Sequence, residues 1–273
     1  MKLDVRELAE QANNLMGKDV ILEGWIRNHR KQKEFGFIEF YDGTSFKNLQ
    51  IVYDNKLANF DAITKYMVGS SIRVYGKLVE SQGKQEFEIS ASNIELLGDC
   101  DESYPIQPKR HTREFLREVG YLRPRTNLFR AVFRIRSLAA MAIHEYFQDR
   151  GYVYLHAPLI TGSDCEGAGE MFQVTTLDLE NLKKENGSVD YKQDFFKKRA
   201  SLTVSGQLQG EAFAMAFKKI YTFGPTFRAE NSNTKTHAAE FWMIEPEIAF
   251  CDLDGLMDIE EDVLKYIIRY VLE

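Results

Sequence analysis

Apolar and polar positions alternate with a short period through the first hundred residues. Residues 21–29 and 35–43 have the composition of strands, and the segments FKNLQIVYD, SSIRVYGKLVES and QEFEISASNIELL continue the pattern between glycine-containing turns. Between the third and the fourth of these five strands, apolar residues from Leu57 to Met67 recur at helical spacing. Three strands, a helix and two strands is the order of a five-stranded OB barrel, and another small β barrel is the alternative.

A segment without periodicity follows, and helical patterns then mix with strands. Residues 98–110 contain two prolines, which indicates a linker. Residues 129–151 form an amphipathic helical pattern that ends at a glycine, and Pro158 restricts the strand that follows to an edge or an end. The rest of the pattern predicts a strand, turn and helix over 200–217, two strands over 218–230 and 238–250, and a long amphipathic helix from 252.

These patterns divide the chain into a barrel (1–98), a hinge (99–125) and a domain of mixed helix and strand (126–273). Within the last part, residues 179–199 form a charged insertion of loop and short helix. A length of 273 residues suits about two domains, and 44% hydrophobic residues are enough for a sizeable core.

Several classes of protein are disfavoured by what the chain lacks. No apolar run approaches the roughly 20 residues of a membrane helix, and the start MKLDVRELAEQ has no apolar stretch of a secretory signal. Cys100, Cys165 and Cys251 lie far apart without CxxC or Cys/His pairing. We therefore expect no metal site, no disulfide framework and no membrane contact, and a cytoplasmic location.

The charge distribution is uneven. The net charge is −6, yet residues 109–136 hold nine Lys or Arg against the two acids Glu114 and Glu118. A strip of this kind is either a solvated helix face or a surface that faces phosphates, and charge alone favours neither reading.

Candidate chemistry concentrates on the two strands around the polar turn NSNTKTH. Arg228, Glu230, Phe241, Glu245 and Glu247 stand at period-two positions, so they can share one face of a hairpin. Burial of such a set as plain core is costly. An arginine suits a phosphate through bidentate donation, and an aromatic ring can stack on a purine base. The alternative is an ordinary hairpin with a salt-bridged face.

The spacing of Phe227-Arg228-Ala229-Glu230, His237, Phe241 and Glu245 resembles motif 2 of the class II aminoacyl-tRNA synthetases. The helix and strand before Pro158 resemble motif 1 of that class. The segments SDCEGAGEMF, LTVSGQLQGEAF and FRAENSNTKTHAAEFWMIEPE resemble the asparaginyl-tRNA synthetases, which share an N-terminal OB barrel with the aspartyl and lysyl enzymes. The resemblance covers essentially the whole chain. It implies an all-β OB barrel followed by an α+β class II core, an antiparallel sheet with helices.

The resemblance also implies roles in ATP binding for four residues. Arg228 matches the catalytic arginine that grips the α-phosphate, and Glu230 matches an acid near the adenine and the acceptor end. His237 fills the basic position that reaches toward the γ-phosphate. Phe241 resembles the ring that stacks on adenine.

Three further matches concern the amino acid. Glu166 falls in a loop whose family acid holds the α-ammonium group, and Ser205 and Gln207 match the S-x-Q-L segment of the amino-acid pocket. Aspartyl enzymes carry a lysine shortly after that segment, where this chain has Gly210. Glu245 matches an acid at the pocket floor of the asparaginyl enzymes and is then expected to accept an N–H from the substrate carboxamide. This favours asparagine over aspartate. Aspartyl-type specificity is the alternative, as is a glycine at 210 needed only for close packing.

The barrel sequence GWIRNHRKQKEFGFIEFYDG resembles the anticodon-binding strands of the same enzymes. Phe37 matches the ring that stacks on the central anticodon base, and Arg30 and Gln50 match neighbours that contact backbone and base. Without the resemblance, Phe37 reads as a core aromatic.

The third class signature, G-x-G-x-G-x-E-R, is absent from these residues, so the core is incomplete at its C-terminus and the principal Mg²⁺ ligands are expected beyond it. The implied function is asparagine–tRNA ligation by a homodimer, with ATP and Mg²⁺ as cofactors and L-asparagine and tRNA(Asn) as partners. We expect weak or no adenylation by these residues alone. A non-catalytic tRNA-binding fragment and an ammonia-using asparagine synthetase are the alternatives.

Overall fold

The computed structural model describes residues 1–83, 85–165, 167, 170–232, 234 and 236–273. The chain divides into two compact units, Met1–Arg134 and Ile135–Glu273. In the part of the chain that the structure describes, no helix combines the length and the apolar character needed to cross a bilayer.

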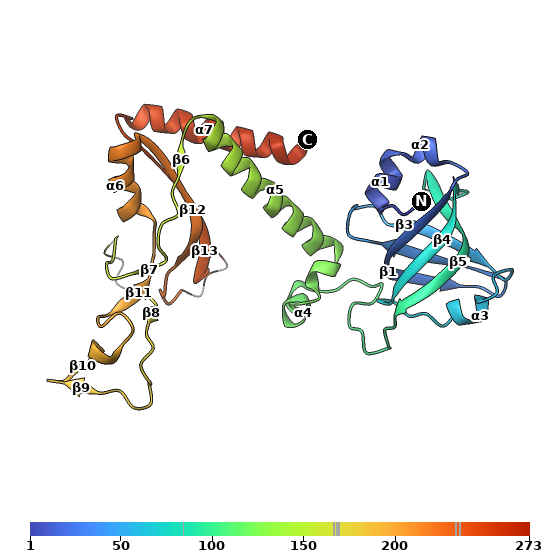
Figure 1. Cartoon of the computed structure of the whole chain (residues 1–273), viewed down its shortest axis with the longest axis horizontal. Coiled ribbons are helices and arrows are strands. Elements are labelled where there is room, and N and C mark those ends of the chain that lie inside the picture. The colour runs from blue at the N-terminus through green and yellow to red at the C-terminus, as the bar shows by residue number, and fades with distance from the viewer. Residues whose placement is uncertain (84, 166, 168–169, 233, 235) are drawn as a thin grey trace. The chain divides into compact units, whose positions relative to one another are not determined.

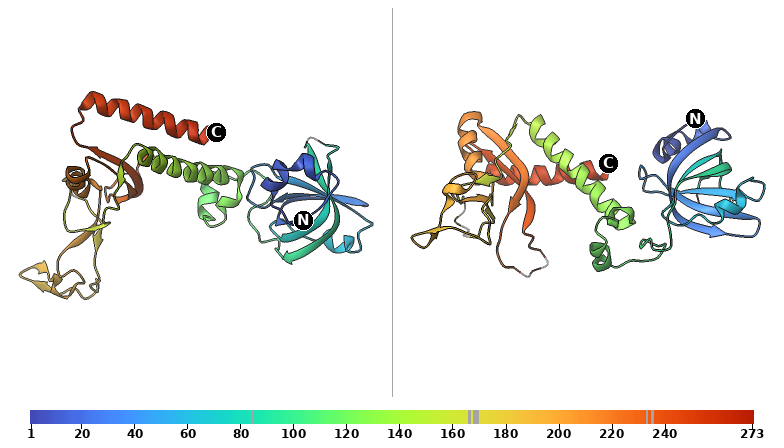
Figure 2. Two further views of the ribbon diagram at one scale, coloured as in Figure 1. Left: turned by 45° about the horizontal axis from the view of Figure 1, so that its top comes forward. Right: turned by 60° about the horizontal axis from the view of Figure 1, so that its bottom comes forward.

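The first unit is built around a closed five-stranded barrel (Figures 1 and 2). Its strands are β1 (Asp19–Lys31), β2 (Phe35–Tyr41), β3 (Leu49–Asp54), β4 (Ser71–Glu80) and β5 (Phe87–Gly98), in the closed order β1-β2-β3-β5-β4. The prediction of an OB barrel is confirmed. The side chains that alternate inward along the strands form its core, with Leu22, Ile38, Phe40 and Ile51 fully buried.

The helix between β3 and β4 is shorter than the pattern predicts. It is the single turn α3 (Phe60–Ile63). The side chain of Asn59 donates to the carbonyl oxygen of Ile94 at 2.7 Å instead of capping the helix. Ile63 is buried in the barrel core, so the apolar spacing reflects packing on the barrel rather than a long helix.

Two short helices precede the barrel and were not predicted. In α1 (Val5–Glu10), Asp4 and Glu7 form a capping box, and α2 (Ala12–Leu15) follows directly. Beyond the barrel, the hinge contains α4 (Arg113–Glu118) and the short 3₁₀ helix η1 (Arg123–Arg125).

The second unit has two long helices and a three-stranded sheet. α5 (Asn127–Asp149) leads into this unit, and α7 (Leu253–Leu272) ends the chain. The sheet has the order β13-β12-β6, in which β12 (Lys219–Phe227) pairs antiparallel with β13 (Glu240–Ile248) and parallel with β6 (Val153–Tyr154). The remaining elements are β7 (Ile160–Thr161), β8 (Gln173–Val174), β9 (Lys184–Glu185), β10 (Ser188–Val189), η2 (Tyr191–Gln193), β11 (Ala200–Leu202) and α6 (Gln207–Phe217).

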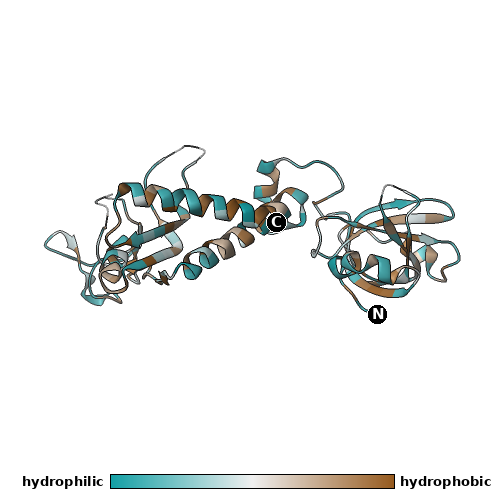
Figure 3. Cartoon of the chain, turned by 90° about the horizontal axis from the view of Figure 1, so that it is seen from above, coloured by the Kyte–Doolittle hydropathy of each residue, from teal (hydrophilic) through white to brown (hydrophobic). Residues whose placement is uncertain are grey.

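An aromatic core joins the long helices to one face of this sheet. The rings of Phe147 and Tyr221 stack with centroids 4.6 Å apart, and Tyr146 is fully buried beside them. Both long helices carry apolar and polar residues along their length (Figure 3). Because Tyr221 and Phe223 point toward the long helices, the even-numbered positions of β12 lie on the other face, where α6 packs near the buried Ile220.

Candidate functional site

The β12–β13 hairpin gathers charged and aromatic side chains on the face away from the aromatic core. Thr222 pairs with Glu245 and Thr226 with Phe241, so Phe241, Glu245 and Glu247 share one face. Arg228 follows β12 directly, and its backbone N–H donates to the carbonyl oxygen of Ala239 at 3.0 Å. Its guanidinium carbon lies 5.5 Å from the centroid of the Phe241 ring. The cation and the ring therefore stand on the same side of the hairpin.

A cavity of about 370 Å³, which we call the Arg228 pocket, opens at this end of the hairpin. Arg228, Glu230, His237 and Phe241 all line it, together with Ser232, Thr236, Ala238 and Ala239. The His237 ring is hydrogen-bonded to the hydroxyl of Thr234. All four residues predicted for ATP thus surround one space. A guanidinium, an imidazole, a carboxylate and an aromatic face are groups suited to a nucleotide.

The predicted amino-acid residues meet farther along the same face. The Ser205 hydroxyl donates to Oε1 of Glu245, and the Thr222 hydroxyl donates to its Oε2 at 2.7 Å. The backbone N–H of Gly206 donates to Oε2 at 3.1 Å. A carboxylate has about four acceptor positions, so these three donors fix the side chain and leave capacity for one more. With Gly206 and Thr222, Glu245 borders a cavity of about 160 Å³.

The start of α6 brings two glycines close to the hairpin. A Cβ added to Gly206 would lie 2.9 Å from Cγ2 of Thr222, and one added to Gly210 would lie 3.2 Å from Cγ of Glu247. Close packing of α6 on the sheet therefore accounts for a small residue at position 210. A glycine at position 210 also places no cationic side chain beside Glu247. Burial, and then the charges of Glu211 and Glu245, raise the pKa of the Glu247 carboxyl above its usual range.

Two predicted residues are not brought into this arrangement. The Nε2 of Gln207 donates to Oε1 of Glu211 at 2.9 Å, along α6 rather than toward Glu245. Glu166 lies outside the described residues. Thr222 and Glu211 were missed by the sequence reasoning. The sequence could have identified Thr222, since alternation along the strand puts it on the same face as Thr226 and Arg228.

On the barrel, the three predicted RNA-contacting residues share another cavity, of about 340 Å³. This Phe37 pocket is lined by Asn28, Arg30, Phe37, Glu39, Gln50 and Gln85. The guanidinium carbon of Arg30 lies 5.1 Å from the centroid of Phe37, and Arg30 donates to Oε1 of Gln50 at 3.2 Å. Nε2 of Gln50 donates to Glu88 at 2.7 Å.

The interpretation of Phe37 as a core aromatic is wrong. Its strand neighbours Ile38 and Phe40 are fully buried, whereas Phe37 points outward and is partly exposed. Asn28 and Glu39 line the same pocket and were missed. Their parity along β1 and β2 matches that of Arg30 and Phe37, which is the signal that was available.

The described residues do not fit a metal site. Among them, no three His, Cys, Asp or Glu side chains come close enough together to hold an ion. We therefore assign no magnesium ligand within the described part of this chain.

Comparison with known proteins follows the division of the chain. The family described as tRNA synthetases class II (D, K and N) matches residues 112–273, and the OB-fold nucleic acid binding domain matches residues 20–97. The chain is 59% identical to the asparagine–tRNA ligase of Acholeplasma laidlawii, over 100% of this chain and 60% of that protein. It is 59% identical to the one of Clostridium novyi, over 98% of this chain and 58% of that protein. The chain therefore spans about three fifths of these relatives.

A solved structure agrees with the fold. The crystal structure of asparaginyl-tRNA synthetase from Pyrococcus horikoshii complexed with asparaginyl-adenylate superposes with a TM-score of 0.83 at 26% identity. The match covers 100% of this chain and 58% of that one.

Proposed function

Because the chain belongs to the class II tRNA synthetases of the D, K and N type, we propose that it serves in asparagine–tRNA ligation. The reaction joins L-asparagine to tRNA(Asn) at the expense of ATP. The curated relatives named asparagine–tRNA ligase and the Pyrococcus structure with asparaginyl-adenylate support this substrate. The observation that carries the proposal is the gathering of Arg228, Glu230, His237 and Phe241 around one cavity, on the sheet face that also holds Glu245.

The geometry suggests how these residues act on ATP. The asparagine carboxylate attacks the α-phosphorus, the bond to the β-phosphate oxygen breaks, and pyrophosphate leaves. Arg228 stabilises the charge that develops on the α-phosphate, while Phe241 stacks on adenine and holds the nucleotide in line. His237 contacts the γ-phosphate, and Glu230 lies toward the adenine. The terminal hydroxyl of tRNA then takes the acyl group and AMP leaves.

Magnesium, when bound with ATP, neutralises charge on the phosphates. Since the described residues do not form a site for it, the roles above concern the protein side chains alone.

Glu245 gives a reason for selection of asparagine. Its carboxylate is fixed by Ser205, Gly206 and Thr222 and has acceptor capacity left for the N–H of a carboxamide. The carboxylate of aspartate in the same place would meet a negative charge without a compensating cation, because position 210 is glycine. Glu166 completes this proposal as the partner of the substrate ammonium group, and Gln207 as a residue of the pocket wall.

The barrel is proposed to read the anticodon. Phe37 stacks on one base, while Arg30 and Gln50 add hydrogen bonds that select it. The division into barrel (1–98), hinge (99–125) and class II core (126–273), a homodimer and a cytoplasmic location complete the proposal.

Pyrophosphate exchange dependent on asparagine tests the catalytic part. We expect weak or no exchange by the chain, and loss of any exchange in Arg228→Ala. Normal turnover by the chain would contradict the first expectation, and exchange with aspartate in preference to asparagine would contradict the substrate.

A second candidate is tRNA binding without catalysis. The closed barrel with its own Phe37 pocket favours it. Binding of an RNA hairpin with the asparagine anticodon GUU, together with no exchange at any asparagine concentration, would identify this case. The barrel argues against an ammonia-using asparagine synthetase, since synthesis of free asparagine needs no anticodon reader.

A further inference from the structure

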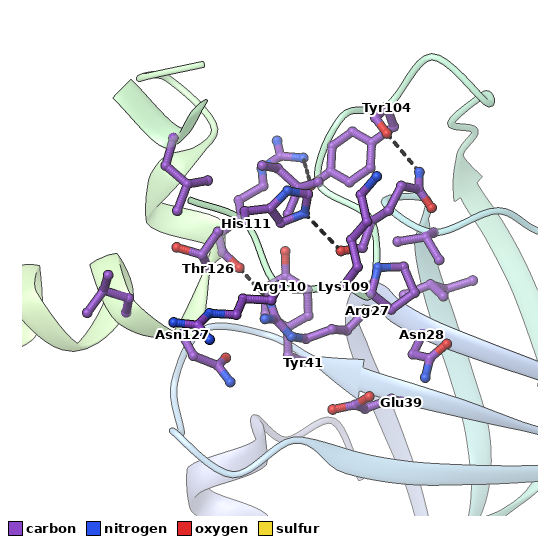
Figure 4. A pocket seen from close by; sticks show the side chains of 18 residues that line it. Arg27, Asn28, Glu39, Tyr41, Tyr104, Lys109, Arg110, His111, Thr126 and Asn127 are labelled. Carbon is purple, nitrogen blue, oxygen red and sulfur yellow. Dashed lines mark hydrogen bonds between the residues drawn. The ribbon is translucent and has the colours of Figure 1, made fainter. Parts of the chain in front are cut away.

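A cavity of about 570 Å³ lies within the first unit, between the barrel wall and the hinge. We call it the barrel–hinge pocket. Strands β1 and β2 form one wall through residues such as Arg27 and Tyr41, and hinge residues around Tyr104, Lys109 and Arg110 form the other. Figure 4 shows these side chains gathered around one space, with strands and hinge on either side.

The lining of this pocket is strongly cationic. Four cationic side chains contribute to it, those of Arg27, Lys109, Arg110 and Arg125, against the single carboxylate of Glu39. Among the described residues, none of the four forms an ion pair. Glu39 itself accepts a hydrogen bond from Asn48 at 2.5 Å.

The two arginines nearest the barrel are held by neutral partners. Arg27 donates to the carbonyl oxygen of Arg125 at 2.6 Å, and Arg125 donates to the hydroxyl of Tyr104 at 3.3 Å. Such partners fix the guanidinium groups without cancelling their charge. Burial lowers the pKa of the nearby Arg130, whereas the hydrogen bond with Tyr104 raises the pKa of Arg125 in the pocket wall. A concentration of like charge without counter-ions is stabilised by a bound anion.

Lys109 and Arg110 are the exposed cations of the set. Within the described residues, no side-chain hydrogen bond from either of them is formed. They can therefore reach an anion at little cost in existing contacts.

The barrel–hinge pocket adjoins the Phe37 pocket. Asn28 and Glu39 line both cavities, so the two share a wall. A single RNA strand that lays one base on Phe37 carries its backbone along this wall toward the cations.

We propose that the barrel–hinge pocket binds a backbone phosphate of the RNA strand whose base lies in the Phe37 pocket. The proposal rests on the RNA-binding part of the proposed function and adds a phosphodiester subsite to it. Lys109 and Arg110 contact the phosphate, and Arg27 and Arg125 supply the surrounding positive field. A free nucleotide has the same phosphate chemistry, but the shared wall favours a continuous strand.

The test compares two double variants of the whole chain. Lys109→Ala/Arg110→Ala removes the proposed contacts. Lys56→Ala/Lys65→Ala removes two exposed cations of the same unit that line neither pocket. The affinity of each for a short RNA hairpin with a GUU loop is measured over a series of salt concentrations.

Loss of the contacts to this one phosphate makes the logarithmic salt dependence of the affinity shallower by about 0.7 for a single strand. Between about 50 and 200 mM salt, the affinity of Lys109→Ala/Arg110→Ala should then fall about 2.6-fold less than that of the parent chain. We expect the slope of the control to stay close to that of the parent. Equal slopes in the two variants, or no hairpin binding by the parent at low salt, would overturn the proposal.

Further arms separate the possible failures. With a hairpin that has a scrambled loop, the salt slope should decrease by the same amount from the parent to Lys109→Ala/Arg110→Ala, because phosphate contacts are independent of sequence. If Phe37→Ala leaves the preference for GUU unchanged while the slope effect persists, the anticodon reading fails and the phosphate subsite stands. If AMP binds the parent but not Lys109→Ala/Arg110→Ala, while the hairpin binds both with the same salt slope, the pocket is a free-nucleotide site and the RNA assignment is wrong.

Discussion

The guanidinium group of Arg228 lies over the ring of Phe241, with its carbon 5.5 Å from the ring centroid. Arg228 stands just past the end of β12, and Phe241 is paired with Thr226 on the neighbouring strand. A cation is attracted to the face of an aromatic ring, so the pair holds its own orientation. The pair presents a hydrogen-bond donor for phosphate and a stacking surface for a base to one cavity. The proposed nucleotide site depends on this arrangement.

Phe241→Ala should weaken ATP binding while leaving the fold intact. Stacking of a base on an aromatic ring contributes roughly 1–3 kcal/mol, so affinity should fall roughly five- to 150-fold. Equilibrium dialysis with ATP measures this. Trp242→Phe, which changes the other face of β13, is the control and should bind ATP like the parent. Equal losses in both variants would show that the effect is structural.

Glu245→Gln should destabilise the second unit and reduce discrimination between asparagine and aspartate. The carboxylate accepts from Ser205, Gly206 and Thr222, whereas a glutamine side chain turns one of those acceptors into a donor. We expect a loss of about 1–3 kcal/mol in the free energy of unfolding, measured by urea titration.

Glu240→Gln at the exposed start of β13 is the matched control for this change. It should unfold like the parent chain. If Glu245→Gln is as stable as the control, the hydrogen bonds to Glu245 carry no net stability.

Gly36→Ala should disrupt the barrel beside Phe37. An added Cβ would lie 2.6 Å from Cε1 of Tyr53, whose ring is buried and whose hydroxyl is bonded to Nε2 of His29 at 2.7 Å. Overpacking of this kind costs about 1–3 kcal/mol. Thermal unfolding measures the loss. Gly83→Ala, where the nearest atom is 3.5 Å away, should leave the midpoint almost unchanged, and a similar midpoint for the two variants would contradict the packing argument.

The barrel and the motif hairpin were predictable because their patterns are local. Period-two alternation places Ile38 and Phe40 inside and Phe37 outside once the strand is recognised, and the same rule puts Phe241 and Glu245 on one face. The alternative of a core aromatic at Phe37 stayed open because composition alone does not tell which parity of a strand faces the core.

Features that depend on long-range contacts were not predictable. α3 is a single turn, and the side chain of Asn59 before it bonds to Ile94 on a distant strand instead of capping the helix. By contrast, the hydrogen bond from Gln207 to Glu211 is local, one turn along α6, and it was missed because the resemblance places Gln207 in the amino-acid pocket. The barrel–hinge pocket needs β1 and the hinge side by side, which neither segment reveals alone.

Asp194 offers a test of the charged insertion between β8 and β11. Its carboxylate accepts from the Thr175 hydroxyl at 2.7 Å, and from the backbone N–H groups of Thr176 and Phe195. These hydrogen bonds, that of Thr175 foremost, lower the pKa of Asp194 to about 2. Because the pKa is lower in the folded chain than in the unfolded one, the stability that this carboxylate contributes is present above about pH 4 and is lost as the pH falls through about 2.

Asp194→Asn should therefore open this segment at neutral pH, since the amide supplies one acceptor oxygen where four donors, the Thr176 hydroxyl among them, converge. We expect faster trypsin cleavage at Lys197 and Lys198 at neutral pH, and a flatter loss of amide-exchange protection in this segment as the pH falls from about 4 to 2. Glu180→Gln, on the same insertion but without a side-chain hydrogen bond among the described residues, should be cleaved like the parent. If the acid limb is unchanged in Asp194→Asn, it belongs to another carboxylate, such as Asp178, whose pKa is also lowered by its hydrogen bond with Asn181.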